Sequence, residues 1–349
     1  MRVLQAMAGA PYGGAEAFFT RLVIALHQAG LEQRVLMRPN EARETILQDN
    51  GIRPMLARFG GALDITTRYT FKSQIKDFKP DIVMTWMNRA THFCPSTGAK
   101  GGEKGSFVHI ARLGGYYDLK YYKSCDHLIG NTEDIVQYLT QSGWPQERAH
   151  YLPNFVAGKQ GKPIDRGKLY TPKNTTLILG LGRLHPNKAF DTLLEAVSRV
   201  PNTYLWIAGE GPEREKLESL AEKLAIKPRV RFLGWREDAA DLLATCDIFV
   251  CPSRHEPLGN VVIEAWAQSK PVVAADGLGP GTLIEHMETG LLVPVDDAPM
   301  MGRAIRHVIE NDDVRERIAR QGNDVYQEHF MESQVVDKYM SFFEERLKD

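Results

Sequence analysis

Short apolar runs alternate along the chain with longer stretches of helical periodicity. Runs such as RVLQAM (2–7) and DIVMTW (81–86) are apolar at most positions, which predicts strands buried on both faces of a sheet. Between residues 15 and 30, apolar positions recur every three or four residues, which predicts an amphipathic helix that ends at Gly30. Further strands are expected at 33–38, 107–112, 127–132, 175–182, 203–211, 230–235, 247–253 and 271–276. This alternation indicates α/β architecture, with parallel sheets covered by helices on both faces.

The alternation breaks once, between residues 156 and 174, where the chain is rich in Gly, Lys and Pro and has no apolar period. Such a composition is typical of a linker. At 349 residues the chain also exceeds what one hydrophobic core usually organises. We therefore expect two Rossmann-like, doubly wound domains, residues 1–157 and 158–332, that face a central cleft. The amphipathic stretch 333–349 is long enough to return to the first domain as a helix.

Composition and charge exclude several classes of protein. Hydrophobic residues make up 43% and the net charge is −1, which argues against a dedicated nucleic-acid binder. The chain contains neither an apolar stretch long enough to span a membrane nor the pattern of a signal peptide. The four cysteines form no C-x-x-C pair, so buried thiols are expected rather than metal ligands. We expect a cytoplasmic protein without a metal centre.

Two cations follow the first predicted strand of the second half, in GLGRLHPNKAF (180–190). Arg183 and Lys188 bracket a loop at the carboxyl end of this strand, a position that suits a diphosphate ligand. The alternative is an ordinary solvated loop. Gly180 and Gly182 are not followed by a third glycine at His185, so the dinucleotide fingerprint is missing and a nicotinamide-dependent oxidoreductase is disfavoured.

Two acids stand eight positions apart in RHEPLGNVVIEAW (254–266). Glu256 falls in a loop after a predicted strand, and Glu264 falls about one turn inside the next helix. Gly259 permits close backbone approach, and Asn260 is expected to cap the helix, whose first N–H groups attract an anion. Taken alone, Glu264 is better explained as a helix-dipole glutamate and Glu256 as an exposed loop acid. The combination with Arg183 and Lys188 favours one shared ligand.

Several motifs resemble glycosyltransferase family 4. GLGRLHPNK, IAGEGPEREKL, VRFLGW, HEPLGNVVIE, KPVVAAD and ETGLLVP follow the order of its C-terminal half, and GGAE (13–16), CDHLIGNT (125–132) and YLPNFV (151–156) fit its N-terminal half. Members of this family are retaining, nucleotide-sugar-dependent enzymes of the GT-B fold. The resemblance implies a retaining glycosyltransferase that moves a hexose from a donor such as GDP-mannose or UDP-hexose, with no further cofactor. A nucleotide-sugar epimerase or hydrolase on the same fold is the alternative, and it would turn over donor without an acceptor.

The resemblance also implies a role for each matching residue. Arg183 and Lys188 would hold the donor diphosphate and stabilise its departure, and these two with Glu256 are the expected catalytic residues. Glu256 would meet hydroxyls of the donor sugar, and Glu264 would bind the ribose. The other expected donor-binding residues are Gly14 at the start of the first helix, Gly182, Gly211, Trp235 near the base, Pro257, Leu258, Gly259 and Asn260. The sequence contains no D-x-D motif, which fits a metal-independent site where Arg and Lys replace the divalent ion.

The strand at 107–112 departs from the family pattern. Many relatives have a histidine near the donor sugar at the end of this strand, where this chain has Arg112, with His109 three residues earlier. Side chains alternate along a strand, so the two residues face opposite ways. We expect Arg112 to lie in the cleft as a fourth catalytic residue and His109 to be packed or on the surface.

The segment RLGGYYDLKYYKSCDHLIGNT (112–132) is similar to bacterial lipopolysaccharide-core glycosyltransferases. Those enzymes act on lipid-linked acceptors at the cytoplasmic face of the inner membrane, which implies a glycan or lipid-linked acceptor and peripheral membrane contact. A basic-aromatic helix is the candidate for this contact, but an ordinary surface helix packed on its sheet is the favoured explanation of the same pattern. Its positions are Arg68, Lys72, Lys76 and Lys79, with Phe71, Ile75 and Phe78 on another face.

Overall fold

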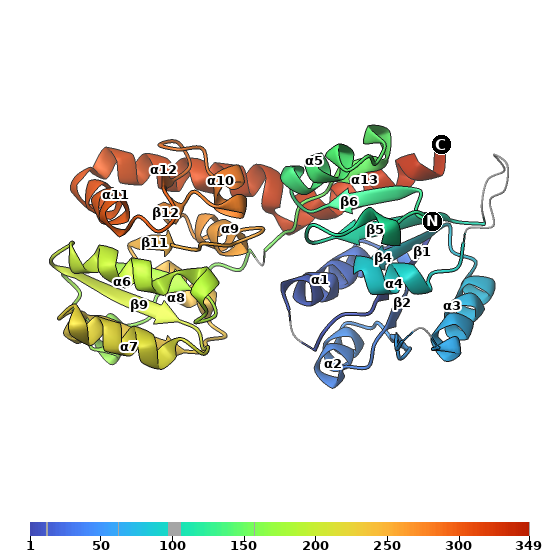
Figure 1. The fold of residues 1–349 in the computed structure, drawn as a ribbon, viewed down its shortest axis with the longest axis horizontal. Helices are drawn as coiled ribbons and strands as arrows, with labels where there is room; N and C mark the ends of the chain where they lie inside the picture. The colour runs from blue at the N-terminus through green and yellow to red at the C-terminus, as the bar shows by residue number, and fades with distance from the viewer. Residues whose placement is uncertain (12, 62, 97–105, 157, 349) are drawn as a thin grey trace. The chain divides into compact units, whose positions relative to one another are not determined.

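The fold consists of two compact units, each built on one parallel sheet (Figure 1). It is described here from a computed structural model of the chain. The structure describes residues 1–11, 13–61, 63–96, 106–156 and 158–348. Unit 1 comprises Met1–Phe155 and the C-terminal helix α13 (Glu332–Lys348), and unit 2 comprises Val156–Met331.

Unit 1 contains a seven-stranded sheet of order β3-β2-β1-β4-β5-β6-β7, in which each neighbouring pair is parallel. Its strands are β1 (Arg2–Met7), β2 (Glu32–Met37), β3 (Met55–Leu56), β4 (Ile82–Trp86), β5 (Val108–Leu113), β6 (His127–Gly130) and β7 (Ala149–Tyr151). The five longer strands confirm the sequence prediction. The sequence analysis missed β3 and β7 because two or three residues are too few to show a period.

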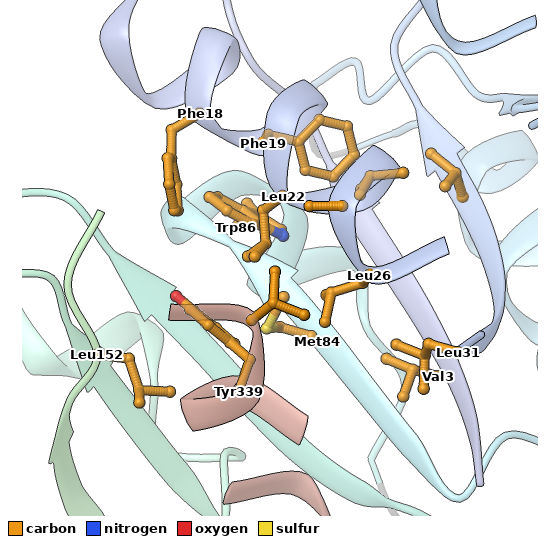
Figure 2. Close-up of a cluster of buried hydrophobic side chains, with 14 of the residues drawn as sticks. Val3, Phe18, Phe19, Leu22, Leu26, Leu31, Met84, Trp86, Leu152 and Tyr339 are labelled. Carbon is orange, nitrogen blue, oxygen red and sulfur yellow. The ribbon is translucent and has the colours of Figure 1, made fainter. Parts of the chain in front are cut away.

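Helices cover both faces of this sheet, and the last helix of the chain is one of them. They are α1 (Gly14–Gln28), α2 (Glu41–Asp49), α3 (Ile65–Phe78), α4 (Met87–Phe93), α5 (Glu133–Gln141) and α13, with short 3₁₀ turns at Leu119–Tyr121 and Gln146–Arg148. Figure 2 shows Phe18 and Leu22 of α1 in one core with Trp86 of β4 and Tyr339 of α13. The C-terminal helix therefore completes the core of the unit that the N-terminus begins.

The aromatic face of α3 lies against the sheet. Phe71 and Phe78 are buried in a core cluster of unit 1, and Ile75 packs against that cluster. Arg68 donates a hydrogen bond to His92 (3.2 Å) and stacks over Phe93. The burial of Phe71 and Phe78 confirms the interpretation that the sequence favours, an ordinary surface helix packed on its sheet.

Unit 2 contains a six-stranded sheet of order β10-β9-β8-β11-β12-β13, also parallel at each pairing. Its strands are β8 (Thr176–Leu181), β9 (Thr203–Ala208), β10 (Val230–Gly234), β11 (Ile248–Cys251), β12 (Val272–Ala275) and β13 (Leu291–Val293). Its helices are α6 (Phe190–Ser198), α7 (Arg214–Lys223), α8 (Ala239–Thr245), α9 (Asn260–Ala267), α10 (Leu278–Leu283), α11 (Ala298–Glu310) and α12 (Asp312–Val325), followed by a π-helical turn, Tyr326–Phe330. Separate apolar clusters on the two faces show the predicted doubly wound arrangement.

The described part of the Gly/Lys/Pro-rich stretch, Val156 and residues 158–174, is packed on unit 2. Val156 is buried, the Gly161 amide donates to Gln268 Oε1 (2.9 Å), and Arg166 forms an ion pair with Asp247 (2.7 Å). A short 3₁₀ turn, Arg166–Leu169, lies within it. This segment therefore has the composition of a linker, but hydrogen bonds and an ion pair hold it against unit 2.

His109 of β5 lies inside unit 1 on the face opposite Arg112, as strand alternation predicts. Its Nδ1 hydrogen-bonds the Ser124 carbonyl oxygen (3.2 Å), which makes Nδ1 the donor, and its Nε2 lies 3.0 Å from the Thr85 hydroxyl. Burial lowers the pKa of His109 to about 4, from an ordinary value of 6.5. The imidazole is therefore neutral in the folded protein at neutral pH.

This burial predicts a pH dependence of stability. Because the folded pKa lies below the unfolded one, the unfolded chain binds the proton first, and stability is lost as pH falls from about 6.5 towards 4. We expect His109 to account for a loss of about 2.5 kcal/mol between pH 7.5 and 4.5. Urea unfolding of the wild type and of His109→Asn at both pH values measures it. An equal pH dependence in the two proteins would contradict the assignment.

Candidate functional site

The predicted site loops of unit 2 meet where its strand order reverses. The chain continues from β8 to β9 on one side and from β11 to β12 on the other, while β8 and β11 are neighbours. Loops at the carboxyl ends of two such strands diverge and leave a crevice, which is where parallel sheets bind ligands. Arg183 and Lys188 follow β8, and Glu256 follows β11.

An ion pair joins these two loops. The Lys188 ammonium contacts Glu256 Oε2, and Ser253 Oγ lies 3.5 Å from the same oxygen. The side chains of Lys188 and Glu256 are 23% and 12% exposed, so the pair is mostly buried but open on one side. Desolvating two charges is costly unless both are well bonded, and such pairs are common where a ligand completes the site. The structure thus brings together a cation and an acid that are 68 residues apart.

Arg254 fixes the relative position of the two loops, and the sequence analysis missed it. Its guanidinium donates to the Pro186 carbonyl oxygen (2.7 Å) and to both carboxylate oxygens of Asp191 (3.0 and 2.8 Å). The hydrogen bond to Asp191 raises the pKa of Arg254. In addition, the His255 amide donates to the Asn187 carbonyl oxygen (3.1 Å). No sequence pattern links Arg254 to Asp191. The one signal in the sequence was the position of Arg254, two residues before Glu256.

A pocket of about 150 Å³ lies at the same edge of unit 2. Arg183, Trp235, Glu264 and Gly182 line it, which are four of the expected donor-binding residues. Trp235 is largely exposed, so one face of its ring is available for stacking. Five further lining residues were not expected from the sequence, although two of them stand in the IAGEG motif: Leu181, Ala208, Gly209, Arg236 and Ala239.

Two glycines permit the close approach of the backbone segments around this pocket. Gly209 has a φ of +148°, and a Cβ atom there would collide with the carbonyl oxygen of Gly182. A Cβ atom at Gly211 would likewise collide with the carbonyl oxygen of Leu184. Gly211 therefore supports the loop that carries Arg183, and it is not among the residues that line the pocket.

Helix α9 begins differently from the sequence prediction. Its N-cap is Gly259, in the left-handed conformation with a φ of +74°, and the N-cap forms no side-chain hydrogen bond. Asn260 is the first helical residue, so the expectation that its side chain caps the helix is wrong. Pro257 and Leu258 lie in the loop before it, and the Gly279 amide fixes that loop by donating to the Glu256 carbonyl oxygen (2.7 Å). Glu264 lies one turn inside α9.

Two expected site residues lie in unit 1. Gly14 is the first residue of α1, and apart from its chain neighbours and its own helix backbone, no atom of the described residues lies within 4 Å of the position that a Cβ atom there would take. Arg112, by contrast, is buried, with 1% of its surface exposed. Its guanidinium lies 4.6 Å from the ring centroids of both Phe18 and Trp86. With so little exposed surface, Arg112 does not have the open position in a cleft that the sequence analysis expects.

The hydrogen bonds of Arg112 explain its burial. Its Nε donates to Tyr339 Oη (2.7 Å) and its Nη2 to Asn154 Oδ1. The expectation of an open, catalytic Arg112 is therefore corrected: it is a core cation that connects β5 to α13, stabilised by two aromatic faces. Tyr339 is 227 residues away in the sequence, so local reasoning had no access to this partner.

Within residues 1–11, 13–61, 63–96, 106–156 and 158–348, no group of three or more His, Cys, Asp or Glu side chains is arranged to hold a metal ion. Over the same ranges, no helix has the length and apolar character needed to cross a membrane.

Comparison with protein families matches both units. The model described as "Glycosyltransferase Family 4" matches residues 12–157, and the model described as "Glycosyl transferases group 1" matches residues 161–325. Together they span nearly the whole chain.

Individual relatives agree with these matches. The chain is 35% identical over 340 residues to the lipopolysaccharide core biosynthesis glycosyltransferase LpsD of Rhizobium meliloti, with 95% of each chain covered. It is 37% identical over 330 residues to LpsE of the same organism, covering 94% of this chain and 95% of LpsE. Among solved structures, Anabaena Alr3699/HepE in complex with UDP-glucose has a TM-score of 0.82 at 20% identity, covering 99% of this chain and 100% of that one.

Proposed function

The chain belongs to glycosyltransferase family 4 and has the GT-B fold, and we propose that it is a retaining hexosyltransferase that uses a nucleotide diphosphate sugar. The observation that carries this proposal is the Lys188–Glu256 pair at the strand-order reversal of unit 2. Lys188 lies on the same loop as Arg183, and Glu256 lies on the loop that follows β11. A nucleotide-sugar epimerase or hydrolase is not favoured, because the relatives that match over the whole chain are glycosyltransferases.

Each side chain has a distinct role in donor binding. Arg183 grips diphosphate oxygens through its fork of donors, and Lys188 adds a point charge. Glu264 accepts hydrogen bonds from the ribose hydroxyls, and Trp235 stacks on the base. Glu256 accepts hydrogen bonds from the donor sugar. The bound donor therefore lies between Lys188 and Glu256, which form an ion pair with each other in the structure.

Catalysis follows from the charge that develops on the leaving group. As the bond from the anomeric carbon to the phosphate oxygen breaks, the diphosphate gains negative charge and the sugar becomes cationic. Arg183 and Lys188, held in place beforehand, stabilise that negative charge without a metal ion. The acceptor hydroxyl then attacks from the face the diphosphate leaves and gives its proton to a leaving phosphate oxygen, so the configuration is retained.

The relatives support a substrate class for each side of the reaction. Two of them are named for lipopolysaccharide core biosynthesis, and both cover nearly the whole chain. This supports a lipopolysaccharide-core acceptor at the cytoplasmic face of the inner membrane. The UDP-glucose complex of a structural neighbour supports a UDP-hexose donor, and GDP-mannose is the other donor to be tested.

Donor turnover with and without acceptor tests the proposal. Purified protein is incubated with UDP-glucose, UDP-GlcNAc or GDP-mannose, alone or with truncated lipopolysaccharide core. We expect release of nucleoside diphosphate only when an acceptor is present, and an acceptor heavier by the one sugar residue of the donor, with the anomeric configuration of the donor. Equal turnover without acceptor would overturn the proposal in favour of a hydrolase or epimerase.

A further inference from the structure

Arg236 lines the same pocket as Arg183 and Glu264 and is not part of the proposed donor contacts. It directly follows Trp235, in the loop that joins β10 to α8. Asp238 binds one edge of its guanidinium through two hydrogen bonds: Nε donates to Oδ1 (2.7 Å), and Nη2 donates to Oδ2. The planar fork of a guanidinium matches the two oxygens of a carboxylate. Asp238 therefore fixes the plane of the Arg236 guanidinium.

Asp238 forms this ion pair instead of capping a helix. It stands at the N-cap of α8, where an aspartate usually accepts a hydrogen bond from an amide of the first helical turn. In this chain its side chain forms no such bond. The hydrogen bonds from Arg236 lower the pKa of Asp238, so its carboxylate stays charged. The carboxylate therefore holds Arg236 in place and does not stabilise the start of α8.

The ion pair leaves three donors of Arg236 for a ligand. A guanidinium has five N–H groups, and Asp238 accepts from two of them. Asp238 accounts for all the hydrogen bonds that the guanidinium forms with the residues the structure describes. Its carboxylate also balances the positive charge of Arg236, which makes the pair a weak ligand for the diphosphate. The remaining N–H groups suit a neutral ligand group that offers hydrogen-bond acceptors.

We propose that Arg236 recognises the edge of the donor base and selects uracil over cytosine, and guanine over adenine. This inference rests on the proposed function, in which Trp235 stacks on the face of the same base. Uracil and guanine carry a carbonyl oxygen at the ring position where cytosine and adenine carry an amino donor. A guanidinium donates hydrogen bonds and cannot accept them, so an amino group facing Arg236 leaves both sides unpaired. Arg236 thus determines base specificity, and Asp238 is a positioning residue.

Calorimetric titration of the full chain with UDP, CDP, GDP and ADP tests this proposal. Each comparison is made between bases of one ring size, so a site that excludes purines is judged from UDP and CDP alone. We expect the wild type to bind the carbonyl base at least about tenfold more tightly than its amino counterpart. Arg236→Ala should weaken UDP binding about tenfold and leave CDP binding close to that of the wild type, which removes the preference.

Asp238→Asn tests the positioning role. Asparagine keeps the size of the side chain and one acceptor oxygen but removes the charge, so Arg236 remains and loses its fixed orientation. We expect the preference for UDP over CDP to fall about threefold. Thermal stability should stay unchanged, because the Asp238 side chain does not cap α8. A purely structural role predicts the reverse, lower stability with an unchanged preference.

Arg315→Ala is the matched control. Arg315 forms an ion pair with Asp312 (2.7 Å) on α12, and its side chain is 34% exposed, against 31% for Arg236. Arg315 is not among the residues that line the pocket. This variant should therefore keep the preference of the wild type.

Two results would overturn the proposal. One is a wild type that does not prefer the carbonyl base, and the other is an Arg236→Ala variant that loses the same factor for UDP and CDP, which would place Arg236 at the ribose or the diphosphate. A preference for UDP over CDP without any sugar transfer would count against the proposed function alone. Equal binding of UDP and CDP by a chain that transfers sugar would count against this inference alone, and a chain that binds no nucleoside diphosphate would overturn both.

Discussion

Replacing Lys188 with alanine is expected to lower sugar transfer by about a thousandfold while the chain remains folded. Lys188 is mostly buried, and it supplies one of the two positive charges next to the departing diphosphate. Its removal also leaves the Glu256 carboxylate without its present partner, and this carboxylate then repels the diphosphate. The affinity for nucleoside diphosphate should therefore fall together with the turnover number.

Steady-state rates and calorimetric titration with UDP or GDP measure both effects. Lys216→Ala is the matched control, because Lys216 is 69% exposed and pairs with Glu213 on the surface of α7. Near-normal transfer by Lys188→Ala, with circular dichroism unchanged, would rule out the diphosphate role. A collapse of the fold in this variant would show that the ion pair is structural.

Replacing Glu256 with glutamine should reduce turnover by about a hundredfold and leave nucleoside diphosphate affinity close to that of the wild type. Glutamine keeps the size of the side chain but removes the charge that accepts hydrogen bonds from the donor sugar. The substitution is therefore expected to lower the affinity for the complete nucleotide sugar and not the affinity for the nucleotide alone.

Parallel titrations with UDP and with a non-hydrolysable UDP-sugar separate these cases. Glu288→Gln serves as a control, because Glu288 lies in the turn before β13 and is not part of the loops that follow β8 and β11. Equal losses of affinity for UDP and for the UDP-sugar in Glu256→Gln would contradict a role at the sugar.

Much of the fold was predictable because its signals are local. Strands such as β1 and β4 are short runs that are apolar at most positions, and such a run is recognised without information from distant segments. The convergence of Lys188 and Glu256 was also predictable, since both follow strands of a parallel sheet and the carboxyl ends of neighbouring strands share an edge. The short strands β3, β7 and β13 lack enough residues for any pattern.

The remaining features depend on contacts between distant segments. The sequence predicted Arg112 in an open cleft. In the structure, Tyr339 and the aromatic rings of Phe18 and Trp86 enclose it. Arg254 binds Asp191 across 63 residues, and no spacing rule connects them. On α3, the helical period separated two faces correctly, but the packing of the sheet decided which one stayed exposed.

The central claim is that Arg183, Lys188, Glu256 and Glu264 hold one donor molecule at the strand-order reversal of unit 2. The most direct test is a crystal structure of the chain with UDP or a UDP-sugar bound. We predict a diphosphate that hydrogen-bonds to Arg183 and Lys188, and a ribose whose hydroxyls donate to Glu264. A nucleotide bound elsewhere, with these side chains out of its reach, would contradict the account.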